Sequence, residues 1–137
     1  MRDLIIVLWA SIFVGGCTSF LKKGELVTVR GRIPVKEMGV SLIHEHVLVD
    51  FIGADSTGYH RWNRSAVVAR ALPYLIQAKE KGVKTFFDCT PAYLGRDPLL
   101  LRELSEKTGI QIVTNTGYYG ARNNLFIPPS AFDATAY

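Results

Sequence analysis

The chain has 137 residues, of which 48% are hydrophobic and 20% are charged, and its formal net charge is +4. This length and composition predict one packed domain and exclude an intrinsically disordered chain. The basic residues are scattered along the sequence, so we expect a solvated surface and no nucleic-acid partner.

The first 16 residues have the pattern of a signal peptide. A short charged start precedes an apolar run over residues 4–14, and two glycines stand directly before Cys17. The run is too short to span a bilayer, which favours a cleaved signal. Small residues that end at a cysteine resemble the lipobox of bacterial lipoproteins. We therefore expect lipidation at Cys17, a tether over residues 17–24, and a place in the cell envelope, at the outer membrane or the periplasmic face. The alternative is an ordinary secretory signal with an incidental cysteine.

A β-hairpin is predicted next. The runs "LVTV" and "IPV" flank Arg30-Gly31-Arg32, where Gly31 gives the backbone the freedom that a turn needs. Pro34 limits the second run to an edge strand. Residues 40–49, "VSLIHEHVLV", are apolar and predict a strand that is covered on both faces.

Residues 65–82 carry apolar side chains at helical spacing. Ser65 is the predicted N-cap and Gly82 the predicted end, while Pro73 should kink the helix. A strand, "VKTFFDCT", follows at residues 83–90. Within it, Cys89 is interpreted as a buried small apolar side chain without a disulfide partner.

A second helix is predicted over residues 96–109, with Asp97 as N-cap, Pro98 in the first turn and Gly109 at the end. A third strand, "IQIVTNTGYYG", occupies residues 110–120. The tail could begin another helix, capped by Ser130. Strands that alternate with helices predict a parallel α/β sheet.

Three strands and two helices do not close a barrel. We therefore interpret residues 25–137 as the N-terminal part of a larger fold. A dinucleotide-binding fold is disfavoured, because no G-x-G-x-x-G follows a strand.

His44 and His46 are the residues that point to chemistry. In a strand, residues two apart face the same side, so both imidazoles should project together while Glu45 points away. Two neutral imidazoles can take adjacent positions on a divalent cation. The alternative is a pair of rim histidines bonded to nearby carbonyl groups. His60 lies in a polar loop and is expected to be exposed.

Three segments resemble, in order and spacing, the phosphotriesterase family of the amidohydrolase superfamily: "VTVRGRIPVKEMGVSLIHEHVLVD", "KGVKTFFDCTPAYLGRD" and "TGIQIVTNTGYYG". The resemblance covers residues 27–119 and implies a (β/α)8 TIM-type barrel with a two-metal centre, usually zinc. In that family a hydroxide that bridges the metals attacks an ester, lactone or phosphotriester. His44 and His46 match the pair of metal ligands on the first strand.

The resemblance also implies that Tyr119 lines the substrate pocket, although a place on the barrel rim would explain it equally. Asp88 could orient a ligand histidine or, as we favour, satisfy local backbone donors. Arg96 and Asp97 match a family segment that helix capping alone explains. The other family ligands, namely a bridging lysine, two histidines and an aspartate, belong to later strands. No catalytic residue is therefore expected within this chain, and the chain alone should be inactive.

Two functions remain open at this point. The first is a lipid-anchored metal hydrolase that acts on a small-molecule ester, lactone or phosphotriester. The sequence does not specify the oligomeric state, and a homodimer is only what the resemblance implies, since relatives are often dimers. The second is a non-catalytic, truncated or degenerate envelope lipoprotein that serves as a ligand-binding module.

Overall fold

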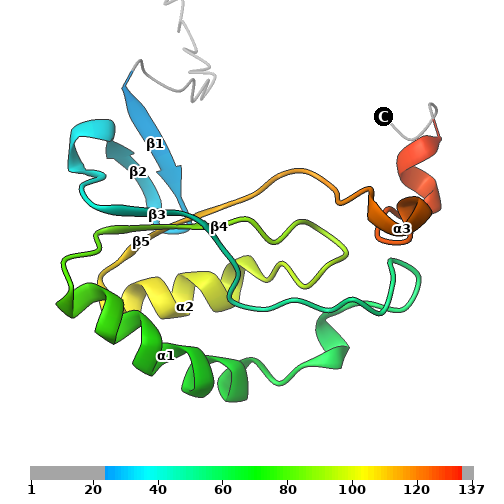
Figure 1. The fold of residues 1–137 in the computed structure, drawn as a ribbon, viewed down its shortest axis with the longest axis horizontal. Coiled ribbons are helices and arrows are strands. Elements are labelled where there is room, and N and C mark those ends of the chain that lie inside the picture. The colour runs from blue at the N-terminus through cyan, green and yellow to red at the C-terminus, as the bar shows by residue number, and fades with distance from the viewer. Residues whose placement is uncertain (1–23, 134–137) are drawn as a thin grey trace, which may run out of the picture.

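The computed structural model describes residues 24–133, which begin with a β-hairpin (Figure 1). Strands β1 (Glu25–Thr28) and β2 (Gly31–Pro34) pair in antiparallel fashion. The predicted hairpin is therefore confirmed. The predicted signal peptide, Cys17 and all of the tether except Gly24 lie outside the described residues.

The turn of the hairpin is formed by Val29 and Arg30, and not by residues 30–32 as predicted. The reason is the Thr28 side chain, which closes the turn: its Oγ1 donates to the carbonyl of Gly31 at 2.9 Å and accepts from the N–H of Arg30 at 3.2 Å. Gly31 begins β2 with a φ of 122°, a value that side-chain-bearing residues rarely adopt.

A three-stranded parallel sheet forms the body of the fold. Its order is β3 (Ser41–Glu45), β4 (Thr85–Asp88) and β5 (Gln111–Thr114), with β4 in the middle. The hairpin is joined to this sheet, because the N–H of Val29 donates to the carbonyl of Ile112 in β5 at 2.8 Å.

Strand β3 is shorter than the predicted strand over residues 40–49, since it ends at Glu45. After that point the N–H of Val47 donates to a side-chain oxygen of Asp88, at 2.9 Å, and not to a backbone carbonyl of the ladder. A side chain has therefore taken over the role of the neighbouring strand, and regular pairing stops.

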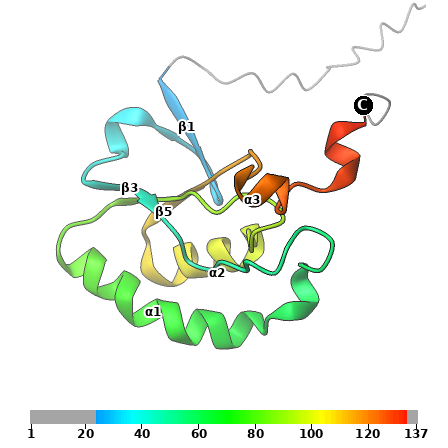
Figure 2. The same cartoon turned by 45° about the vertical axis from the view of Figure 1, so that its right-hand side comes forward.

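Two helices, α1 (Arg64–Glu80) and α2 (Pro98–Thr108), cover the same face of the sheet (Figures 1 and 2). Pro73 lies inside α1, and Gly82 follows its end. The helices and the sheet share one apolar core, made of Val68, Leu75, Phe86, Leu100, Leu101, Leu104, Ile110 and Ile112. This arrangement confirms the predicted α/β class, with three strands and two helices of a (β/α)8 barrel.

The end residues of α2 are those that the sequence predicts. Asp97 is the N-cap, and its Oδ1 accepts from the N–H groups of Leu99 and Leu100 at 3.2 and 3.1 Å. Pro98 opens the helix and Gly109 ends it in the left-handed conformation.

The start of α1 differs from the prediction. Asn63 is the N-cap, with its Oδ1 accepting from the N–H of Ala66 at 2.9 Å, and Ser65 is already inside the helix. The helix begins earlier because Arg64 is fixed by Asp97 at the start of α2, with its Nε 3.0 Å from Asp97 Oδ2.

The other described elements are the short turns η1 (Val35–Glu37), η2 (Tyr59–Arg61), α3 (Ala121–Asn124) and η3 (Pro129–Phe132). Ser130 is not a helix N-cap, because η3 starts before it, after Pro128. The predicted strand over residues 110–120 ends at Thr114. Over residues 24–133, no helix has the length and apolar character that a membrane crossing requires.

Candidate metal site

The two histidines stand at the end of β3, where the strand has a β-bulge. Leu42 pairs with Phe86 and Glu45 pairs with Asp88, so β3 uses one residue more than β4 over the same step. The rings of His44 and His46 lie edge to face with their centroids 5.4 Å apart, and both residues are exposed. The structure thus places the two imidazoles together, although His46 follows the strand and does not lie within it.

His46 is tied to two buried polar side chains. Its Nδ1 lies 3.0 Å from Oγ1 of Thr90, and that hydroxyl donates to Asp88 Oδ1 at 3.2 Å. Thr90 and Asp88 are 0% and 2% exposed. Burial raises the pKa of Asp88, against the opposing effect of the hydrogen bonds from Val47 and Thr90.

Asp88 was expected to satisfy local backbone donors, and the structure shows this role together with a second one. It accepts the backbone N–H of Val47, as a residue that satisfies local donors would, and it also reaches His46 through Thr90. The sequence analysis missed Thr90. A threonine two residues after Asp88, at the end of a predicted strand, was the one available signal.

The two imidazoles suit a divalent cation. Both are exposed on one side of the sheet, and the contact with Thr90 occupies Nδ1 of His46 and leaves its Nε2 free to act as a ligand. Among residues 24–133 no group of three or more His, Cys, Asp or Glu side chains could hold a metal. The described residues can therefore supply a two-histidine part of a coordination sphere.

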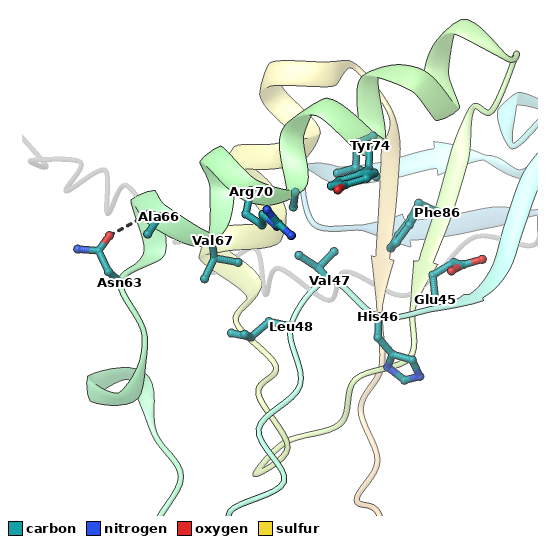
Figure 3. A pocket seen from close by; sticks show the side chains of 12 residues that line it. Glu45, His46, Val47, Leu48, Asn63, Ala66, Val67, Arg70, Tyr74 and Phe86 are labelled. Atoms are coloured by element: carbon teal, nitrogen blue, oxygen red, sulfur yellow. Dashed lines mark hydrogen bonds between the residues drawn. The ribbon is translucent and has the colours of Figure 1, made fainter.

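A hollow of about 620 Å³ lies beside the site, between α1 and the segment that follows β3 (Figure 3). Its walls are mostly apolar and include Val47, Val67 and Tyr74. His46 contributes to its edge, but Figure 3 shows its ring pointing away from Tyr74, and Glu45 pointing in a different direction from His46. The imidazole of His46 therefore does not point into this hollow, and His44 is not among its lining residues.

Tyr119 lies in a separate cluster of aromatic residues. Its ring stacks on Phe126 at 5.6 Å, and Phe126 also contacts Phe51 edge to face at 5.6 Å. Together with Arg122 these side chains line a hollow of about 320 Å³ that neither histidine lines. The substrate-lining role of Tyr119 remains a prediction.

Asp97 joins three parts of the fold. Besides capping α2, its buried carboxylate accepts from Trp62 Nε1 at 3.1 Å and from the Arg64 guanidinium at 3.0 and 3.1 Å. Burial raises the pKa of Asp97, but these hydrogen bonds outweigh burial and hold it below the usual value. The capping role predicted for this residue is confirmed.

The other candidate residues lie apart from the site or beside it. His60 is exposed in η2, as predicted. Arg96 joins two loops by donating from Nη1 to the carbonyl of Asn115. Cys89 is only half-buried, with its Sγ 3.7 Å from the carbonyl of Ile43, so its prediction as a buried side chain is wrong. It follows the end of β4 and lies beside β3, whose residues are themselves half-buried or exposed.

Comparison with known proteins gives one family. Residues 24–134 match the model of the Phosphotriesterase family. The chain is 34% identical over 87 residues to an aryldialkylphosphatase of Saccharolobus solfataricus. This match covers 64% of this chain and 28% of that protein. It is 34% identical over 96 residues to a phosphotriesterase homology protein of Mycobacterium tuberculosis, covering 69% of this chain and 29% of that protein.

Among solved structures, a double mutant of the organophosphorus hydrolase from Deinococcus radiodurans superimposes with a TM-score of 0.63 at 33% identity. The match covers 70% of this chain and 29% of that one. The chain therefore spans less than a third of the length of these relatives.

Proposed function

The chain belongs to the phosphotriesterase family, and on that basis we propose that the whole protein is a metal-dependent hydrolase of ester, lactone or phosphotriester bonds. The observation that carries the proposal is the pair of exposed imidazoles, 5.4 Å apart, at the carboxyl end of β3. In β/α barrels, the chemistry sits at this end of the strands.

His44 and His46 would hold one divalent cation, and zinc is the metal that we propose, because imidazole nitrogen is among its preferred ligands. Such an ion, when bound, lowers the pKa of a water ligand towards ~7 and polarises the electrophilic atom of the substrate. The two histidines keep their place through β3 and its bulge, and His46 is held further by Thr90.

The names of the relatives support the substrate class. One is an aryldialkylphosphatase and another an organophosphorus hydrolase, and both names denote the hydrolysis of bonds to phosphorus. We propose a small-molecule substrate of this kind or a related ester or lactone.

The test uses the whole protein, purified with and without a chelator. Bound metal is measured by elemental analysis, and turnover is measured on an aryl dialkyl phosphate, an aryl ester and a lactone. The variant His44→Ala with His46→Ala should lose both metal and turnover. His60→Ala is the matched control, since it removes an exposed imidazole outside the pair, and it should retain both.

Undiminished turnover in the double variant would refute the proposal. Metal bound by the wild type without turnover on any of the three substrates would favour the non-catalytic ligand-binding module.

We also propose that Cys17 anchors the protein to the membrane by lipid. This proposal rests on the apolar run over residues 4–14 and the two glycines before the cysteine. In cell fractionation, Cys17→Ser should move the protein out of the membrane fraction. An unchanged membrane fraction for this variant would contradict the lipid anchor.

A further inference from the structure

We propose that Thr90 is a positioning residue that fixes the ring and the tautomer of His46, so that Nε2 is the nitrogen offered to a metal. The inference rests on the metal site of the proposed function. Asp88 is part of the same device, because it fixes the Thr90 hydroxyl.

The assignment follows from counting hydrogens. A threonine hydroxyl has one hydrogen to donate. Thr90 donates it to Asp88 Oδ1, at 3.2 Å, so its oxygen can only accept from the Nδ1 of His46 at 3.0 Å. His46 must then carry its hydrogen on Nδ1, and the lone pair of the neutral ring lies on Nε2.

Asp88 Oδ1 is the acceptor and the Thr90 hydroxyl is the donor in the bond between them, and the two cannot readily exchange these roles. Its Oδ1 already accepts from the backbone N–H of Val47 at 2.9 Å, so this oxygen is an acceptor whatever the direction of the other bonds. Asp88 therefore accepts from Val47 on one side and from Thr90 on the other, and the donated hydrogens point from the exposed ring of His46 through Thr90 to Asp88.

Burial gives this arrangement its stiffness. Thr90 and Asp88 are almost without solvent contact, at 0% and 2% exposure, whereas His46 is exposed. An exposed imidazole without a partner can rotate freely and take either tautomer. Here one end of the ring is bonded to a group that the core holds in place. Such support beyond the metal ligands is worth about 10–100-fold in metal affinity.

The experiment measures the zinc affinity of the whole protein, by competition with a chelating dye, in the wild type, in three threonine variants and in the variant His44→Ala with His46→Ala. Thr90→Val removes the hydroxyl with little change in shape, and Thr90→Ser restores it. Thr85→Val is the matched control. Thr85, in β4, is buried like Thr90, which follows that strand, but its Oγ1 donates to the carbonyl of Met38 at 2.6 Å.

Thr90→Val should bind zinc about 10–100-fold more weakly than the wild type. Thr90→Ser should bind within a few-fold of the wild type. Thr85→Val should lower the melting temperature and leave zinc affinity unchanged. Melting temperatures measured alongside separate a loss of metal binding from a loss of folding.

Wild-type zinc affinity in Thr90→Val would overturn the positioning role. An equal loss of affinity in Thr85→Val would do the same, because it would trace the effect to general damage of the strand. If the wild type and the variant His44→Ala with His46→Ala bind zinc equally, the metal site itself has failed, and that outcome is distinct from both.

Discussion

Replacing Asp97 by alanine should destabilise the fold by about 2–3 kcal/mol. Loss of the N-cap of α2 costs about 1 kcal/mol. The N–H of Trp62, now 3.1 Å from Asp97 Oδ2, would lose its acceptor, which adds about 1–2 kcal/mol. The lost ion pair with Arg64 adds no further free energy to this sum, because the Arg64 side chain is 38% exposed and water can replace the carboxylate.

The assay is thermal unfolding of the whole protein, followed by circular dichroism. In a protein as long as the relatives that this chain matches, a loss of this size should lower the melting temperature by roughly 3–5 °C. Asp55→Ala is the control, since it removes a carboxylate that is exposed in a loop, and it should change the melting temperature little. If Asp97→Ala unfolds no earlier than Asp55→Ala, the role of Asp97 as the joint between α1 and α2 is refuted.

Three further predictions concern stability. Because its pKa is lowered, Asp97 stabilises the fold above the ordinary carboxyl pKa, and this contribution disappears as pH falls. The stability advantage of the wild type over Asp97→Asn should therefore shrink below about pH 4, and an equal advantage at acid and neutral pH would contradict this. Gly95→Ala should cost about 1–3 kcal/mol in urea unfolding, because φ is 113° and a Cβ would lie 3.0 Å from the carbonyl of Leu48; unchanged stability would rule out this strain. Pro73→Ala should raise the melting temperature, since a proline inside a helix costs up to about 3 kcal/mol relative to alanine. A fall would mean that the proline fits a bend that α1 needs.

The helix ends show what could be predicted from sequence. Asp97 and Pro98 act at the first turn of α2 and Gly109 acts directly after its last residue, so local patterns were enough to place them. The start of α1 could not be placed in that way. Asn63 and Ser65 are both good N-caps, and the choice between them depends on Arg64 reaching a residue 33 positions away.

In the candidate site, too, the features set by neighbouring residues could be predicted and those set by distant residues could not. Spacing alone predicted that His44 and His46 would lie together, because residues two apart in an extended segment face the same side without any contact from elsewhere in the chain. Thr90 is 44 positions from His46, and nothing local relates them. The bulge in β3 was equally hidden, since an extra residue is defined only against the register of β4.

The bond between Val29 and Ile112 has a consequence for synthesis. The ribosome completes the hairpin early, but the carbonyl that it docks against leaves the exit tunnel only after both helices have been made. A two-stranded hairpin is marginal in water on its own. During translation the hairpin must therefore wait, undocked, until β5 emerges, and this makes it a place where a chaperone or a protease could act on the nascent chain.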